Sequence, residues 1–257
     1  MKIEKIPNIN YLWSGLIIEE LARNGAQRFC IAPGSRSTPL TISAAENDKV
    51  QKTIHYDERG LGFYALGISS GGKGPAVLIS TSGTAVANFL PAVIEASKKK
   101  VPLILLTADR PPELRKTGAL QTIDQAGIFG SYVKWDFDLP VPDINIKPEA
   151  VLTTIDQAIF MATSGTPGPV HINCMFREPL APEESGGEWR KGLDLNKKWV
   201  QSGDPYTKYI SPGDSFSIDD LKEIAEIINR SKKGIIVAGK LKDNEGKGVI
   251  ELAEKLK

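Results

Sequence analysis

Hydroxyl and guanidinium groups follow the first strongly apolar run of the chain. The stretch CIAPGSRSTPL, residues 30–40, leaves an expected buried strand through a Pro-Gly turn and carries Ser35 and Arg36. The guanidinium is a planar fork that matches a carboxylate, and a helix that begins near Ser37 would add free N–H groups that attract anions. The turn therefore has the chemistry of a carboxylate or phosphate site. The alternative is that Ser37 or Thr38 only caps a helix, because both residue types are common N-caps.

A glutamate occupies the next expected transition from strand to helix. In HYDERGLGF, Glu58 lies just past a strand and at the start of a helix, and Gly60, Leu61 and Gly62 follow it. Surroundings of this kind hydrate a carboxylate poorly and favour its protonated or hydrogen-bonded form, so Glu58 is a candidate catalytic carboxylate. The alternative is an ordinary acidic residue at a helix N-terminus, which the helix dipole stabilises.

Small polar residues follow the third expected strand. In STSGTAVANF, Ser82, Gly83 and Thr84 supply hydroxyls and backbone N–H groups where a strand gives way to a helix. These groups could cradle a polar ligand. Capping of the helix by Ser82 or Thr84 explains the same residues equally well.

A charged loop follows the fourth expected strand. In TADRPPELRKTGALQTIDQ, Arg110 precedes two prolines that stiffen the loop and delay any helix. Arg110, Arg115 and Lys116 are cationic, and Gln121 and Gln125 add amide groups. A solvated charged loop is the alternative.

The elements that must position these residues alternate along the chain between strand and helix. Five short apolar runs predict strands, at 27–33, 52–57, 75–81, 101–108 and 168–174. Segments with helical periodicity predict helices at 8–25, 38–47, 58–71, 83–100 and 147–164. Nearly continuous apolar strands that alternate with helices indicate a doubly wound, mostly parallel α/β sheet with helices on both faces, over residues 1–182.

In such a sheet the carboxyl ends of the strands share one edge, and ligands bind there. The arginines, Glu58 and the hydroxyl-rich turns all follow strands, so they can converge. Their combined chemistry favours a small anionic ligand with several carboxylates.

The composition changes after residue 182. Residues 183–214 are rich in Pro, Gly and charged residues and indicate a linker and surface loop. Residues 215–257 predict a helix capped by Ser217, one strand at 233–240 and part of another helix. We expect these to be the start of a truncated central α/β domain, because a single strand cannot form a sheet. The sequence would then be a piece of a longer protein, or a partner would complete it.

Bulk properties exclude several classes of protein. The net charge of +1 gives no basis for binding nucleic acid or a membrane. The two cysteines, Cys30 and Cys174, lie in apolar runs and are expected to be reduced core residues of a cytoplasmic protein.

The motifs together resemble the thiamine-diphosphate-dependent enzymes. HYDERGLGFYALG is similar to the segment that carries the catalytic glutamate of that family, and TSGTAVAN resembles its TSGPGATN stretch, with Asn88 at the final position and Thr84-Ala85 in place of Pro-Gly. APGSRSTPL, the loop after residue 106 and GTPGPVHIN narrow the resemblance to the MenD branch, which works in menaquinone biosynthesis.

The resemblance implies a transferase that decarboxylates 2-oxoglutarate on thiamine diphosphate and adds the carbanion to isochorismate. It implies that Glu58 hydrogen-bonds the aminopyrimidine ring and that Ser82, Gly83, Thr84 and Asn88 also contact the cofactor. Substrate binding is implied for Ser35, Arg36, Arg110 and Gln121. It further implies a homo-oligomer, a dimer or a tetramer.

The length departs from the family pattern. The diphosphate-binding domain that carries the Mg²⁺ ligands has no counterpart in the sequence, so we expect no metal ligand in this chain, weak cofactor binding and no synthase activity from the chain alone. Two alternatives stay open, namely another thiamine-dependent decarboxylase or carboligase, and a non-catalytic module that binds carboxylates. Arg36 and Arg110 argue against a substrate with one carboxylate, because such a substrate needs fewer cations.

Overall fold

The computed structural model describes residues 6–72, 74–185, 189–190, 197–209, 218–239, 241 and 245–256. The chain divides into two compact units, Met1–Ile210 and Ser211–Lys257. The first unit holds the sheet and all of the candidate site residues.

Six parallel strands form one sheet in the first unit. The strands are β1 (Arg28–Ile31), β2 (Gln51–Ile54), β3 (Ala76–Ser80), β4 (Leu103–Asp109), β5 (Trp135–Leu139) and β6 (Val170–Met175). Their order across the sheet is β2-β1-β3-β4-β6-β5. The expected α/β fold with a parallel sheet is therefore confirmed.

Helices connect these strands. They are α1 (Ile9–Arg23), α2 (Thr38–Glu46), α3 (Glu58–Ser70), α4 (Thr84–Ala87), α5 (Leu90–Lys98), α6 (Pro148–Thr163) and α7 (Lys197–Ser202). Side-chain capping defines two of the starts, because Asn8 accepts from the N–H groups of Asn10 and Tyr11 and Asp57 accepts from that of Gly60.

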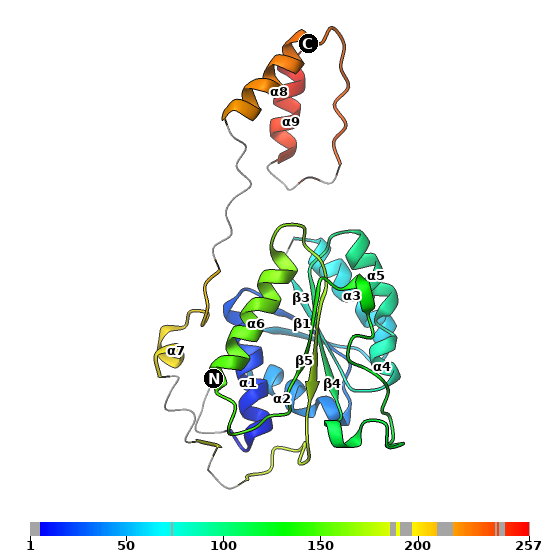
Figure 1. The fold of residues 1–257 in the computed structure, drawn as a ribbon, viewed down its shortest axis with the longest axis vertical. Coiled ribbons are helices and arrows are strands. Elements are labelled where there is room, and N and C mark those ends of the chain that lie inside the picture. The colour runs from blue at the N-terminus through cyan, green and yellow to red at the C-terminus, as the bar shows by residue number, and fades with distance from the viewer. Residues whose placement is uncertain are drawn as a thin grey trace. The chain divides into compact units, whose positions relative to one another are not determined.

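The sheet separates two apolar layers. Helices α1, α2 and α6 lie on one face, and α3, α4 and α5 lie on the other (Figure 1). Strand β3 shows why both faces are filled, since Val77 and Ile79 belong to the first cluster while Ala76 and Leu78 belong to the second. Successive side chains of a strand point to opposite faces, so a strand covered on both sides is apolar throughout.

The direction of chain winding reverses between β1 and β3. From β1 the chain crosses to the edge strand β2 and then returns to β3 on the other side of β1. Ligands bind at such a switch point, outside the carboxyl ends of the strands. The turn with Arg36 and the turn with Ser82 are therefore neighbours at this point.

Two elements differ from the sequence-based expectation. Strand β5 was not predicted, because WDFDL alternates charged and apolar residues and has an exposed or half-exposed pattern over most of its length. The single helix expected over 83–100 is divided into α4 and α5 near Pro91, whose ring nitrogen cannot donate a backbone hydrogen bond.

Part of the stretch that was read as a linker packs against the first unit. Trp199 is 4% exposed, and its indole Nε1–H donates to the Glu20 carboxyl group. The guanidinium of Arg23 lies 3.9 Å from the centre of a Trp199 ring. Tryptophan carries enough apolar surface to hold a loop of this kind in place.

The second unit contains α8 (Ile218–Arg230) and α9 (Glu245–Lys255). Residues 233–239 of the expected strand form no strand, and Ile235 is 91% exposed. A strand needs a partner to pair with, and the described residues of this unit supply none. Ser217 lies outside the described residues.

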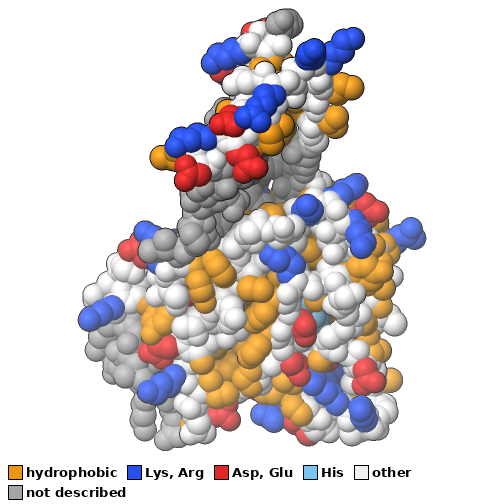
Figure 2. Space-filling view, turned by 45° about the horizontal axis from the view of Figure 1, so that its top comes forward, with side chains coloured by type: hydrophobic (Ala, Val, Ile, Leu, Met, Phe, Trp, Pro, Cys, Tyr) orange, Lys and Arg blue, Asp and Glu red, His pale blue; other side chains and the backbone are white. Residues whose placement is uncertain are grey.

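Charged side chains of both signs are interspersed on the face that Figure 2 shows, in keeping with a net charge of +1. Among the described helices, none has the length and apolar character needed to cross a membrane. Both cysteines are free and buried, as expected.

Candidate functional site

The loops that follow β1 and β3 touch at the switch point. A Cβ atom on Gly34 would lie 2.5 Å from the Cβ atom of Thr81, so the approach depends on the absence of a side chain at residue 34. Ser35 is exposed at the tip of this turn, whereas Ser37 is buried and its hydroxyl donates to the carbonyl oxygen of Gly34 at 3.0 Å. Ser37 therefore stabilises the turn, and Ser35 is free to meet a ligand.

Arg36 is buried beneath the same turn. Its Nη1 donates to the carbonyl oxygen of Phe176 at 2.9 Å, and its Nη2 lies 3.3 Å from the Glu178 carboxylate. Its Nε is buried and has no hydrogen-bond partner among the described residues. A buried donor without a partner is costly, and an anion at this turn would remove that cost.

Arg110 is the second guanidinium at the switch point. It is half-buried, and its Nη1 donates to the hydroxyl of Ser82. Burial lowers the pKa of Arg110, the positive charge of Arg36 lowers it further, and Asp109 and Glu178 act in the opposite direction. The structure thus brings Arg36 and Arg110 close enough to repel each other, which favours binding of an anion.

Gln121 and Gly83 join the same group. The Gln121 side-chain amide donates to the carbonyl oxygen of Ser82 at 2.9 Å. A Cβ atom on Gly83 would lie 2.8 Å from Cγ of Gln121, and Gly83 has a φ of 83°. Glycine is therefore required here both for space and for its backbone conformation.

A buried amide supports this turn from below. Gln125 is 2% exposed, and its Oε1 accepts from the N–H of Gly83 at 3.1 Å. Its Nε2 donates to Oδ1 of Asn173 at 2.7 Å and to the carbonyl oxygen of Ala108 at 3.0 Å. Gln125 therefore ties the loop after β3 to strands β4 and β6.

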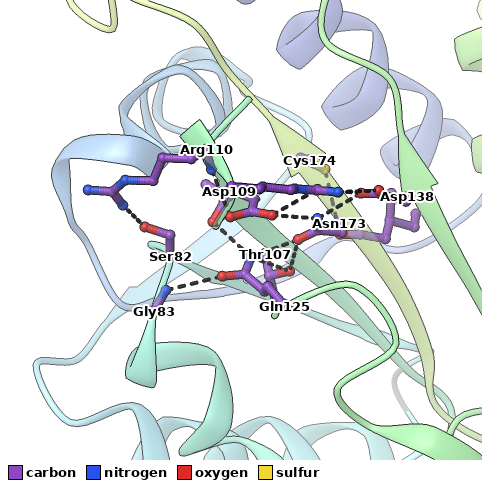
Figure 3. A network of polar contacts seen from close by, with 12 residues as sticks. Ser82, Gly83, Thr107, Asp109, Arg110, Gln125, Asp138, Asn173 and Cys174 are labelled. Atoms are coloured by element: carbon purple, nitrogen blue, oxygen red, sulfur yellow. Dashed lines mark hydrogen bonds and ion pairs between the residues drawn. The ribbon is translucent and has the colours of Figure 1, made fainter. Parts of the chain in front are cut away.

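The network continues from Asn173 to two carboxylates (Figure 3). The Asn173 amide donates to Asp109 at 2.9 Å and to Asp138 at 2.8 Å. Arg115 lies against the same two carboxylates, at 2.9 Å from Asp109 and 2.8 Å from Asp138. The bidentate contact with Arg115 and the bond from Asn173 lower the pKa of Asp138 against the effect of burial. Arg115 and Asn173 each contact both carboxylates, so the network ties the loops after β4 to β5 and β6.

A neutral histidine closes the network on the other side of Asn173. His171 is 1% exposed and its Nε2 lies 2.7 Å from the hydroxyl of Thr107. Burial lowers the pKa of His171 to about 4. The Thr107 hydroxyl also donates to Asn173 at 3.2 Å, so His171 is a structural member of the core.

Glu58, Thr84 and Asn88 are not joined to this group by any hydrogen bond or ion pair of their side chains. Glu58 is half-buried as the first residue of α3, and no described residue bonds to its carboxylate. Thr84 and Asn88 are exposed at the two ends of α4. Glu58 follows β2, whereas Thr84 and Asn88 follow β3, and all three are available to a ligand at the carboxyl edge of the sheet.

The polar network below the turns was missed by the sequence reasoning. Asn173 and His171 stand inside an apolar strand, and Gln125 was expected only as a second amide group of the charged loop, beside Gln121. Polar residues within a run that is otherwise fully buried are the signal that points to such a network, because buried polar groups need partners. Among the described residues, no group of three or more His, Cys, Asp or Glu side chains could hold a metal ion.

A known family model matches this region. The family described as thiamine pyrophosphate enzyme, N-terminal TPP binding domain, matches residues 14–128. These residues include Arg36, Glu58, Ser82 and Arg110.

Curated relatives match nearly the whole chain. The 2-succinyl-5-enolpyruvyl-6-hydroxy-3-cyclohexene-1-carboxylate synthase of Salinibacter ruber is 49% identical over 91% of this chain and 40% of its own length. The proteins with the same name from Rubrobacter xylanophilus and Shewanella baltica are each 46% identical, over 97% and 100% of this chain. The chain spans 40–44% of the length of these relatives.

A solved structure has the same fold. The thiamine diphosphate-dependent 4-hydroxybenzoylformate decarboxylase of Rhodococcus jostii matches with a TM-score of 0.65 and 18% identity. The match covers 86% of this chain and 38% of that protein. The sheet and its helices are therefore an arrangement that is already known.

Proposed function

We propose, from the premise that this chain belongs to the thiamine pyrophosphate enzyme family, that it acts as the N-terminal part of a 2-succinyl-5-enolpyruvyl-6-hydroxy-3-cyclohexene-1-carboxylate synthase. The proposed reaction decarboxylates 2-oxoglutarate and adds the product to isochorismate, as a step of menaquinone biosynthesis. Relatives with this name, at 45–49% identity, support the assignment. The domain limits of 1–182, 183–214 and 215–257 remain part of this proposal.

One observation carries the proposal. Arg36 and Arg110 come from loops after different strands, and the charge of Arg36 lowers the pKa of Arg110 at the switch point. Two like charges held together repel, and an anion that binds to both would reduce the repulsion beyond what Asp109 and Glu178 provide. Both proposed substrates carry two carboxylates, and a guanidinium binds a carboxylate with two parallel hydrogen bonds.

The substrate-binding roles follow from this arrangement. Arg36 would bind a substrate carboxylate through its guanidinium, whose buried Nε has no partner among the described residues, and Ser35 is exposed one residue earlier. The guanidinium of Arg110 donates to the hydroxyl of Ser82, and the side chain of Gln121 lies against Gly83. These four residues, Ser35, Arg36, Arg110 and Gln121, would orient the dicarboxylate over the turns.

The residues present also fit the proposed cofactor. Glu58 is half-buried with no partner among the described residues, so its carboxyl group can hydrogen-bond the aminopyrimidine nitrogen. Thr84 and Asn88 are exposed and available to the cofactor, whereas Ser82 and Gly83 are buried beside Gln121, so their contact with the cofactor would require Gln121 to move. Thiamine diphosphate, when bound, supplies the electron sink for the decarboxylation.

Three further points complete the proposal. Mg²⁺ would be held by residues of the diphosphate-binding domain, as the family resemblance implies. The family resemblance supports a homo-oligomer. The two buried thiols, Cys30 and Cys174, support a place in the cytoplasm.

Calorimetric titration of the 257-residue chain tests the proposal. Isochorismate, 2-oxoglutarate and thiamine diphosphate with Mg²⁺ would be titrated separately into the wild type and into Arg36→Ala and Arg110→Ala. We expect the dicarboxylates to bind the wild type and to lose about tenfold or more in affinity in each variant, because a hydrogen bond to a charged group contributes about 1.5–3 kcal/mol.

Arg28→Ala is the matched control. Arg28 is the first residue of β1, at the opposite end of the strand from Arg36, so its loss changes the net charge equally and leaves the site intact. Equal affinities in the wild type, Arg36→Ala and Arg28→Ala would contradict the proposal. No binding of either dicarboxylate would contradict a site preformed within this chain.

A further inference from the structure

The segment after β6 brings a carboxylate to the arginine pair. Glu178 lies 3.3 Å from Nη2 of Arg36, and the carbonyl oxygen of Phe176 accepts from Nη1 of the same guanidinium at 2.9 Å. Both contacts come from one short segment, so the position of this segment decides how Arg36 is held. The Glu178 side chain is 69% exposed, whereas that of Arg36 is 10% exposed. The carboxylate therefore approaches the buried arginine from the solvent side, where a ligand would enter.

Two residues of α1 hold the same segment. The Asn10 side-chain amide donates to the carbonyl oxygens of Arg177 at 2.9 Å and Pro179 at 3.0 Å. The Tyr11 hydroxyl donates to the carbonyl oxygen of Leu180 at 2.8 Å. Contacts with both neighbours of Glu178 leave its backbone little freedom.

Two further contacts hold the segment and orient Glu178 itself. Arg177 forms two hydrogen bonds with Glu113 in the loop after β4. The backbone N–H of Leu180 donates to Oε2 of Glu178 at 3.2 Å, which leaves Oε1 directed at Arg36. The carboxylate is thus held in place by the protein and does not reach Arg36 by chance from a mobile side chain.

Glu178 acts on both arginines. Its negative charge raises the pKa of Arg110, although burial and the charge of Arg36 lower that pKa overall. Glu178 supplies one negative charge to the two guanidiniums, and Asp109 acts on Arg110 in the same direction. Nη2 of Arg36 is already paired with a carboxylate of the protein, that of Glu178.

We infer that Glu178 is a built-in counter-ion of the arginine pair, and that an anionic ligand competes with its carboxylate for Arg36. The inference rests on the proposed function in that it concerns the same anion site. Without a ligand Glu178 compensates the repulsion between Arg36 and Arg110. With a ligand its charge opposes the incoming carboxylate. Glu178 therefore sets the affinity of the site for anions, and its effect is larger for a dianion than for a monoanion, because the repulsion scales with ligand charge.

The variant Glu178→Gln separates charge from structure. The glutamine keeps a side-chain oxygen for the N–H of Leu180 and removes only the negative charge. The control Glu183→Gln makes the same change of net charge on the chain, at a residue whose side chain has no contact with Arg36 among the described residues.

The test measures the thermal unfolding midpoint of the wild type and the two variants at increasing concentrations of succinate or inorganic phosphate. Propionate, titrated in the same way, is the monoanion for comparison. Sodium chloride at equal ionic strength corrects for general screening. Without an added anion, we expect Glu178→Gln to unfold at a lower temperature than Glu183→Gln. The succinate concentration that gives half of the stabilisation should fall about two- to fivefold in Glu178→Gln, in the range set by exposed ion pairs, and less for propionate.

A background without the arginine completes the test. In Arg36→Ala, the further change Glu178→Gln should alter the response to succinate much less, because the ion-pair partner of Glu178 is absent and only its weaker effect on Arg110 remains. The inference is overturned if Glu178→Gln responds to anions as Glu183→Gln does, or if it needs more anion than the wild type for half of the stabilisation. It is also overturned if Glu178→Gln lowers the half-stabilising succinate concentration equally in the wild type and in Arg36→Ala. Failure of isochorismate and 2-oxoglutarate to bind would contradict the proposed function and leave this anion response measurable.

Discussion

Gly34 and Thr81 lie so close that a Cβ atom on the glycine would be 2.5 Å from the Cβ atom of the threonine. The two residues belong to the loops after β1 and β3, the strands on either side of the switch point. This contact fixes how near the turn with Arg36 lies to the turn with Ser82. The spacing of the candidate anion site therefore depends on the small size of Gly34. Its φ of −166° is one that any residue could adopt, so the glycine is needed for space and not for its backbone conformation.

The first prediction concerns that contact. Gly34→Ala should force the two loops apart and lower the free energy of unfolding by about 1–3 kcal/mol, the usual cost of overpacking. It should also weaken the binding of succinate. Urea unfolding and calorimetry would measure the two effects. Gly67→Ala is the control, since a Cβ atom there meets nothing within 4 Å. A stability of Gly34→Ala equal to that of Gly67→Ala would contradict the packing argument.

The second prediction concerns the amide below the turn. Gln125→Leu removes the acceptor of the Gly83 N–H and the donor to Asn173, so buried polar groups lose their partners. We expect a loss of about 1–3 kcal/mol for each such group, measured by urea unfolding. Gln121 is exposed, and Gln121→Leu should change stability little while it weakens dicarboxylate binding. If the two variants were equally stable, Gln125 would not have the positioning role.

The contrast between these two glutamines shows what sequence reasoning can reach. Arg36, Ser82, Arg110 and Gln121 were found because each follows a predicted strand, and parallel strands end at one edge. The spatial convergence of these four residues was therefore predictable from the order of the elements.

The support below them was not predictable in the same way. Asn173 bonds to Asp109, which is 64 residues away along the chain, and to Asp138 on a strand that was not predicted. Similarly, Trp199 packs on Glu20 and Arg23 from a stretch that has linker composition. Pairings of this kind depend on the register of strands and on loop paths, which local periodicity does not contain.

The third prediction concerns the carboxyl group of Glu20. Burial, a hydrogen bond with Asp156 and repulsion by the negative charge of Asp156 raise the pKa of Glu20 from 4.5 to about 8. Between about pH 4.5 and pH 8 the folded chain therefore keeps a proton that the unfolded chain releases, so the free energy of unfolding falls as pH rises.

Glu20→Gln should remove that decline, because the glutamine is neutral at every pH. We expect the variant to match the wild type near pH 4.5 and to exceed it by a few kcal/mol at pH 8, from about 1.4 kcal/mol per pKa unit. Urea unfolding of both proteins across this range would measure the difference, in which His171 and the other titrating groups cancel. A difference that does not change with pH would contradict the raised pKa.

The last prediction separates two adjacent acidic residues at the start of α3. Asp57 accepts from the N–H of Gly60 and caps the helix, whereas Glu58 has no partner among the described residues. Asp57→Ala should therefore lower the free energy of unfolding by about 0.5–2 kcal/mol. Glu58→Gln should leave stability nearly unchanged, because no described contact of its side chain is lost.

Binding of thiamine diphosphate should show the opposite pattern. In the proposed function Glu58 hydrogen-bonds the aminopyrimidine ring of thiamine diphosphate. Glu58→Gln should therefore lower the affinity of the chain for thiamine diphosphate by about tenfold, because a hydrogen bond to a charged group contributes about 1.5–3 kcal/mol. Asp57→Ala should bind as the wild type does at temperatures where both are folded. Calorimetry with thiamine diphosphate and Mg²⁺ would measure both affinities. Equal affinities in the wild type and Glu58→Gln would show that Glu58 does not hold the ring, and the half-buried carboxylate would then be an ordinary residue of a helix N-terminus.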